Sequence, residues 1–94
     1  MTLAIVSMTV TDPEALAAYR EKAGEALAKH GARIVGAGPD PVLIEGSKSP
    51  DAVAVIEFPS PEAVQAWRND PELAETHALR GKIGETTIVV VPGT

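Results

Sequence analysis

Residues 12–20 read Asp-Pro-Glu-Ala-Leu-Ala-Ala-Tyr-Arg, and residues 60–68 repeat this pattern as Ser-Pro-Glu-Ala-Val-Gln-Ala-Trp-Arg. An apolar run precedes each copy, from Leu3 to Val10 and from Ala52 to Phe58. A polar side chain followed by proline is typical of a helix start, and an apolar, β-branched run is typical of a strand. The chain therefore contains two strand–helix units, which predicts a two-fold repeated α+β fold.

The whole order of elements extends this repeat. Strands are expected over residues 2–10, 32–36, 52–58 and 86–91, with residues 42–45 also extended. Helices are expected from Pro13 to about His30 and over residues 61–69 and 71–80, because Asp70-Pro71 interrupts the second helix. The order β-α-β-β-α-β predicts one domain over residues 1–94, a ferredoxin-like sandwich with a four-stranded antiparallel sheet.

Composition excludes several classes of function. The net charge is −5, which disfavours binding to nucleic acid or to an anionic membrane, since both need an excess of Lys and Arg. No apolar run approaches the roughly 18 residues of a membrane span. The chain has no cysteine, so disulfides and thiolate chemistry are excluded. The first residues lack a basic segment and resemble a strand, so we expect a cytoplasmic protein.

Alternation along the strands predicts two different sheet faces. The helices are expected to cover Met8, Val10, Ile56 and Phe58. The opposite face is apolar at one end and polar at the other; it carries Ile5, Ser7, Thr9, Val53, Val55 and Glu57. The core is also poor in aromatic residues. We therefore expect the sheet of a second copy to cover this face, forming a homodimer in which the polar end of the face becomes a shared cavity, with Glu57 beside it.

Glu57 is the candidate catalytic residue. It stands late in a strand among aliphatic neighbours, where burial raises a carboxyl pKa and suits it to acid–base work or to holding a ligand. The alternative is a structural ion pair with Arg33 or Arg80, since buried carboxylates are usually paired.

Three residues of the second helical region are candidate ligand contacts. Trp67 is expected to face the core, although its indole N–H needs a partner and could mark the rim of a pocket. His77 and Arg80 are three residues apart and can point at one anionic group such as a carboxylate. The alternative is an Arg80 bonded to Glu57 or to a helix carbonyl, beside a surface histidine. His30 is interpreted as a helix C-cap.

Other motifs are absent from the sequence. The two histidines lie on different predicted helices, and neither belongs to a metal-binding motif, so no metal and no cofactor are expected. The segment Gly36-Ala37-Gly38 lacks the residues of a phosphate-binding loop and is interpreted as a turn that interrupts the second strand.

The string Val55-Ile56-Glu57-Phe58-Pro59-Ser60-Pro61-Glu62-Ala63, followed by Trp67, Asp70-Pro71-Glu72 and Arg80, resembles the hallmark of a bacterial domain-of-unknown-function family. That family belongs to the dimeric α/β-barrel superfamily. The resemblance implies a homodimer in which two sheets face each other, and it implies no established reaction.

The same superfamily contains cofactor-independent monooxygenases, muconolactone isomerases and haem-degrading monooxygenases. The haem-degrading enzymes carry a Trp and a haem-ligating His at the spacing of Trp67 and His77. They also use an Asn on the first strand, where this chain has Ser7 and Thr9.

The sequence supports three hypotheses. The first is a homodimer that binds a small, partly apolar organic molecule between sheet and helices, oriented by Glu57 and Arg80 with Trp67 on the wall. If such a protein is an enzyme, proton transfer or cofactor-free oxygenation is the expected chemistry. The second hypothesis is a structural or interaction dimer without a ligand, and the third is a haem-binding or haem-degrading protein.

Overall fold

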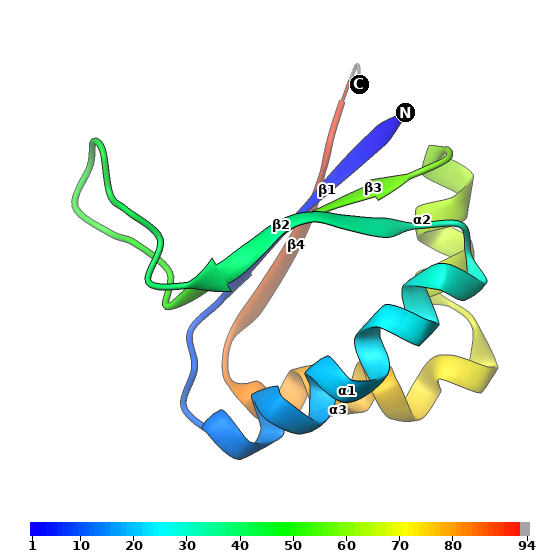
Figure 1. Cartoon of the computed structure of the whole chain (residues 1–94), viewed down its shortest axis with the longest axis horizontal. Coiled ribbons are helices and arrows are strands. Elements are labelled where there is room, and N and C mark those ends of the chain that lie inside the picture. The colour runs from blue at the N-terminus through cyan, green and yellow to red at the C-terminus, as the bar shows by residue number, and fades with distance from the viewer. Residues whose placement is uncertain (93–94) are drawn as a thin grey trace.

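The described residues of the computed structural model, 1–92, form a four-stranded antiparallel sheet with helices on one face (Figure 1). The elements are β1 (Thr2–Met8), α1 (Pro13–Lys29), β2 (Arg33–Pro39), β3 (Ala52–Phe58), α2 (Pro61–Arg68), the 3-10 helix η1 (Pro71–Leu73), α3 (Ala74–Ile83) and β4 (Thr86–Val91). The strand order is β2-β3-β1-β4, which confirms the predicted ferredoxin-like βαββαβ fold.

The repeated helix starts form as their sequence predicts. The Asp12 carboxylate accepts hydrogen bonds from the backbone N–H groups of Glu14 and Ala15, each at 3.1 Å. Ser60 Oγ accepts the N–H of Ala63 at 3.2 Å. Each cap satisfies N–H groups that the first helical turn leaves without partners, and the proline that follows has no N–H to satisfy.

Two strand predictions were wrong at their ends. β1 ends at Met8 and does not reach residue 10, because the Thr9 N–H turns to the Glu85 carbonyl and the Val10 N–H to the Asp51 carboxylate. β2 is not interrupted at Gly36 but runs through to Pro39, with a bulge after Ile34. Hydrogen bonds to β3 stabilise the extended conformation, which glycine by itself does not favour.

The segment between β2 and β3 is a protruding loop (Figure 1). Residues 42–45, which were expected to be extended, form no strand; Val42 is 82% exposed and Ile44 is 89% exposed. The Asp40 N–H donates to the Asp51 carbonyl at 2.9 Å and closes the base of the loop.

The two faces of the sheet differ as predicted. Side chains on the helix face form the core, including Ala4, Val6, Met8, Ile56 and Phe58. The alternating positions Ile5, Ser7, Val53, Val55 and Glu57 are only partly buried. We call these five residues, together with Val89 of β4, the open face. No helix of the described residues is long and apolar enough to cross a membrane.

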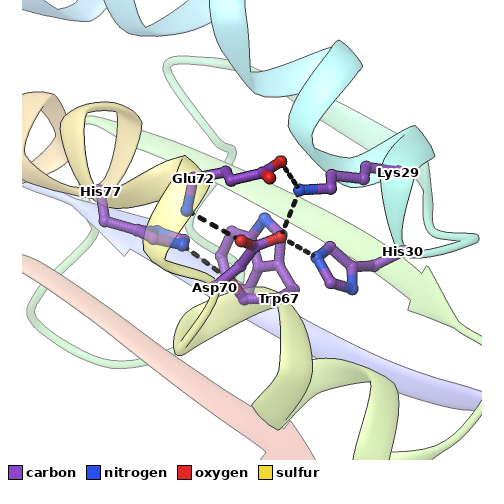
Figure 2. A network of polar contacts seen from close by, with 6 residues as sticks. All are labelled: Lys29, His30, Trp67, Asp70, Glu72 and His77. Atoms are coloured by element: carbon purple, nitrogen blue, oxygen red, sulfur yellow. Dashed lines mark hydrogen bonds and ion pairs between the residues drawn. The ribbon is translucent and has the colours of Figure 1, made fainter.

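A polar network fixes the corner between α2 and η1 against the end of α1 (Figure 2). The Asp70 carboxylate accepts hydrogen bonds from Lys29 Nζ and His30 Nε2, both at 2.8 Å. These two bonds, together with the Glu72 N–H, hold the pKa of Asp70 well below its usual range, and the same contact raises the pKa of Lys29. His30 is the C-cap of α1, as predicted, and its ring adds this tertiary contact.

Candidate functional site

A buried polar cluster lies at the junction of α1, α2 and α3, and it consists of Tyr19, Trp67, His77 and Arg80. Tyr19 and Trp67 occupy equivalent positions in the two sequence repeats. The central carbon of the Arg80 guanidinium lies 5.7 Å from the centre of the Tyr19 ring and 5.1 Å from that of Trp67. The repeat thus places two aromatic rings within cation–π distance of one cation.

Arg80 is a buried cation without an acidic partner. Only 5% of the surface of Arg80 is exposed, and its Nη1 donates to the Tyr19 hydroxyl at 3.2 Å. Among residues 1–92, no carboxylate lies within 4 Å of it. A guanidinium has five N–H donors, and buried charges are normally paired.

His77 is buried against Trp67, with 9% of its surface exposed. Its Nε2 donates to the Trp67 backbone carbonyl at 2.7 Å (Figure 2), and the two rings meet edge-on with centres 4.8 Å apart. Within the described chain, neither His77 Nδ1 nor Trp67 Nε1 has a hydrogen-bond partner. Because Nε2 carries the proton of the neutral ring, Nδ1 is an unused acceptor.

The charge state of His77 follows from its surroundings. Burial lowers the pKa of His77, and the nearby guanidinium groups of Arg80 and Arg68 act in the same direction. The hydrogen bond to the Trp67 carbonyl and the carboxylate of Asp70 oppose them. The ring is therefore neutral at pH 7 and stands in a positive local potential.

Two cavities border this cluster from different sides. The first, which we call the α1 cavity, has a volume of about 400 Å³ and lies between α1 and strands β2 and β3. Its walls are largely apolar, with Met8, Leu16, Tyr19, Ala23, Ile34 and Ala52 among the lining residues. The second, the α3 recess, has a volume of about 410 Å³ and lies between the ends of α2 and α3 and the start of β4. It is lined by Arg68, His77, Arg80, Gly81, Gly84, Thr86 and Ile88.

Glu57 lies on the other side of the sheet. Its carboxylate accepts two hydrogen bonds from Arg33, from Nε and Nη2, both at 3.3 Å. Of the two ion-pair partners that the sequence left open, the structure selects Arg33. Glu57 and Arg80 are separated by the sheet, so the expectation that they jointly orient one ligand within a protomer is corrected. The catalytic role of Glu57 itself stays a prediction.

The other residues predicted to contact a ligand also lie on different sides of the sheet. Trp67, His77 and Arg80 come together, although Trp67 lines neither of the two cavities described above. Ser7 lies on the open face, and Thr9 is an exposed residue directly after β1. The sequence interpretation missed Tyr19 and Arg68 as candidate contacts; the equivalence of Tyr19 and Trp67 in the repeat was the available signal.

The haem-degrading arrangement does not fit these positions. Ser7 and His77 lie on opposite sides of the sheet, and the Nε2 atom of His77 is bonded to a backbone carbonyl. Within residues 1–92, no group of three or more His, Cys, Asp and Glu side chains is placed to hold a metal ion.

Comparison with known proteins gives a family and a fold. The model of a domain of unknown function, DUF1330, matches residues 1–94. No curated protein matches the chain. A structural-genomics target of unknown function from Rhodopseudomonas palustris is 20% identical, with a TM-score of 0.76 over 99% of this chain and 82% of that chain.

Two further solved structures share the fold. A dimeric protein of unknown function with a ferredoxin-like fold from Bacteroides fragilis is 17% identical, with a TM-score of 0.58 over 96% of this chain and 93% of that one. An antibiotic biosynthesis monooxygenase is also 17% identical, with a TM-score of 0.57 over 100% and 99% of the two chains. The chain belongs to the DUF1330 family and has the ferredoxin-like fold seen in dimeric α+β-barrel structures.

Proposed function

We propose that this member of the DUF1330 family is a homodimer that binds a small, partly apolar organic molecule in the α1 cavity. The observation that carries the proposal is a largely apolar cavity whose lining includes Tyr19, a residue whose hydroxyl group is held by Arg80. A volume of about 400 Å³ is within the range of small-molecule sites. The apolar walls favour a carbon skeleton because binding removes its surface from water.

The Tyr19 hydroxyl determines which polar group the ligand needs, namely a hydrogen-bond acceptor. It accepts a hydrogen bond from Arg80, so its own hydrogen is available to donate. A ligand carbonyl oxygen that accepts this hydrogen is polarised, and the Arg80 cation behind the hydroxyl strengthens the effect. Polarising a carbonyl makes its neighbouring C–H bond more acidic. Because the described lining carries no Asp, Glu or His, a water molecule would take that proton, and the enolate that remains begins both isomerisation and cofactor-independent oxygenation. These are the reaction classes that we propose for a ligand that is turned over.

Binding is tested with prodan, a neutral fluorescent naphthyl ketone whose emission rises in apolar surroundings. We expect saturable binding to the wild type, and Ala37→Leu should weaken it about tenfold or more by filling the cavity from exposed strand β2. Tyr19→Phe should weaken it by roughly two- to tenfold, the contribution of one neutral hydrogen bond.

The matched control for the cavity is Ala17→Leu, which makes the same change at an exposed position of α1 outside the cavity lining. It should bind prodan as the wild type does. Absence of prodan binding to the wild type, or equal binding by the Ala37→Leu and Ala17→Leu variants, would contradict the proposed site.

The dimer is proposed from the open face. Ile5, Val53, Val55 and Val89 form an apolar surface, with Val89 52% exposed, where an antiparallel sheet normally carries polar side chains if water covers it. A protein of the same fold from Bacteroides fragilis is described as dimeric, which supports a second copy as the partner.

We expect the wild type to sediment as a dimer at micromolar concentration and Val55→Lys to sediment as a monomer. The lysine would place a charge in the centre of the buried surface, where it has no partner. The control Gln65→Lys adds a positive charge on exposed α2 and should remain dimeric. A monomeric wild type would refute the proposed dimer.

A dimer without a ligand is the second candidate. The Arg33–Glu57 pair favours it, because that pair gives a structural role to the residue that was predicted to be catalytic. A dimeric wild type that binds no prodan is the result that would select this candidate.

A further inference from the structure

Arg20 is the single charged residue in the described lining of the α1 cavity. It is exposed, whereas only 7% of the surface of the neighbouring Tyr19 is exposed. Because both residues line the cavity, Tyr19 belongs to its inner wall and Arg20 to its solvent-facing mouth. A molecule in this cavity therefore has largely apolar walls around one end and a guanidinium group near the other.

The guanidinium of Arg20 has no acidic partner, unlike the two lysines of the same helix. Lys22 forms an ion pair with Glu75, and Lys29 forms one with Asp70. Among residues 1–92, no carboxylate lies within 4 Å of the Arg20 guanidinium. The chain has 13 acidic side chains against 8 basic ones, so the lack of a partner reflects the position of Arg20 and not a shortage of carboxylates.

The surroundings of the mouth also lack a competing carboxylate. The residues three and four positions from Arg20 along α1, which are its neighbours on the helix surface, are uncharged: Leu16, Ala17, Ala23 and Gly24. Asp40 and Asp51 adjoin lining residues in the sequence but do not line the cavity, and the Asp51 carboxylate accepts the Val10 N–H at 2.8 Å. An anion at the mouth therefore meets the guanidinium with no acidic side chain in the described wall to repel it.

The number of charges at the mouth distinguishes a carboxylate from a phosphate. A guanidinium donates two parallel N–H bonds to a carboxylate, whose planar shape matches its own. The described lining contains this one cation and no second one. One cation balances a single negative charge, so a singly charged carboxylate is favoured over a doubly charged phosphate.

We propose that the α1 cavity selects a small oxo acid with an apolar skeleton. Its carboxylate accepts hydrogen bonds from Arg20 at the mouth, and its carbonyl oxygen accepts one from the Tyr19 hydroxyl. Its carbon skeleton lies against apolar lining residues such as Leu16 and Ile34. The inference rests on the function proposed above for this cavity and names the class of molecule that it binds. Prodan, which is neutral, occupies the same cavity without using Arg20.

Three ligands of similar size test the two polar groups of the oxo acid. We expect isothermal titration calorimetry to show saturable binding of 3-benzoylpropionate, an apolar oxo acid, which should also displace prodan. Its neutral amide, 3-benzoylpropionamide, should bind about fivefold more weakly because it lacks the charge. The third ligand, 4-phenylbutyrate, lacks the ketone and should bind roughly two- to tenfold more weakly because it forgoes the hydrogen bond to Tyr19.

Arg20→Gln tests where the carboxylate binds without disturbing the core, because the residue is exposed. It should weaken binding of 3-benzoylpropionate about fivefold and leave binding of the amide and of prodan unchanged. The matched control is Lys22→Gln, which removes a positive charge from an exposed position of the same helix outside the cavity lining and should have no effect. Ala37→Leu, which fills the cavity, should weaken the acid, the amide and prodan alike, each about tenfold or more.

The oxo-acid proposal is overturned if the amide, 4-phenylbutyrate or phenethyl phosphate binds as tightly as 3-benzoylpropionate. It is also overturned if Arg20→Gln weakens the acid and the amide equally, or if Lys22→Gln weakens the acid as much as Arg20→Gln does. Any of these results, with prodan still bound and still excluded by Ala37→Leu, leaves the proposed function of the α1 cavity standing. Acid binding that Ala37→Leu does not weaken, or a wild type that binds neither prodan nor the acid, would refute the cavity and the oxo acid together.

Discussion

Gly84→Ala is expected to destabilise the fold by about 3 kcal/mol or more. Gly84 follows α3 with φ of 150°, a backbone conformation that only glycine adopts without strain. A Cβ at this position would overlap the Thr9 carbonyl oxygen and approach the Thr11 nitrogen to 3.2 Å. Both atoms belong to the backbone, so no side-chain movement relieves the contact.

The site of this overlap is where the two halves of the fold are joined. The Thr9 N–H donates to the Glu85 carbonyl at 2.8 Å. The N–H groups of Thr11 and Asp12 both donate to the Ile83 carbonyl, at 2.8 and 3.0 Å. A shift of the backbone at Gly84 therefore weakens the bonds that hold the α3–β4 connection against the β1–α1 connection.

Thermal and urea unfolding measure this effect. The melting temperature of Gly84→Ala should fall by roughly 12 °C or more for a chain of this size. The control is Gly81→Ala, three residues earlier, where the added methyl group meets open space at an exposed position of α3. It should be neutral or stabilise the protein by up to about 1 kcal/mol. Equal stability of the two variants would refute the backbone argument.

Trp67→Ala is expected to cost about 3–5 kcal/mol of unfolding free energy. Trp67 is 2% exposed, and its ring packs against Phe58 with centres 5.6 Å apart and against the edge of His77. Its removal leaves a large cavity and deprives the Arg80 guanidinium of one of its two aromatic contacts. Chemical denaturation of the variant measures the loss.

Trp67→Phe separates the effect of ring packing from that of the indole N–H. The phenyl ring keeps much of the packing, and the substitution also removes the indole N–H, which has no acceptor among residues 1–92. A buried unpaired donor costs about 1–3 kcal/mol, so its removal offsets part of the lost packing. The phenylalanine variant should therefore lose far less than half of what the alanine variant loses. Similar losses for the two variants would mean that the N–H is bonded in solution.

Local physics made much of the fold predictable. β3 and β4 begin and end at the predicted residues, 52–58 and 86–91, because their apolar runs are bounded by Pro and Gly signals. The break at Asp70-Pro71 also forms, with the Asp70 carboxylate accepting the Glu72 N–H at 2.9 Å. The second helical segment extends to Ile83, three residues beyond the prediction.

The errors occur where distant strands decide the conformation. Gly36 and Gly38 have low strand propensity, but they pair with Val55 and Val53 of β3. Residues 42–45 have good strand propensity, but no neighbouring strand of the described chain pairs with them. A strand forms only where a partner supplies its hydrogen bonds, and a single sequence does not state that partner.

The sequence alone determined the repeat, its caps and the assignment of Glu57 to the sheet face opposite the core. Each of these depends on neighbours within a few residues. Only the tertiary structure decided that Glu57 pairs with Arg33, and that Arg80 meets the Tyr19 hydroxyl, 61 positions earlier in the chain. That contact depends on how α1 and α3 pack against each other on one face of the sheet, and the shapes of the two helix surfaces together set this packing. The repeated Tyr19 and Trp67 thus act as a pair around Arg80. Tyr19 lines the α1 cavity and Arg80 lines the α3 recess, and the hydrogen bond between the two residues connects these cavities.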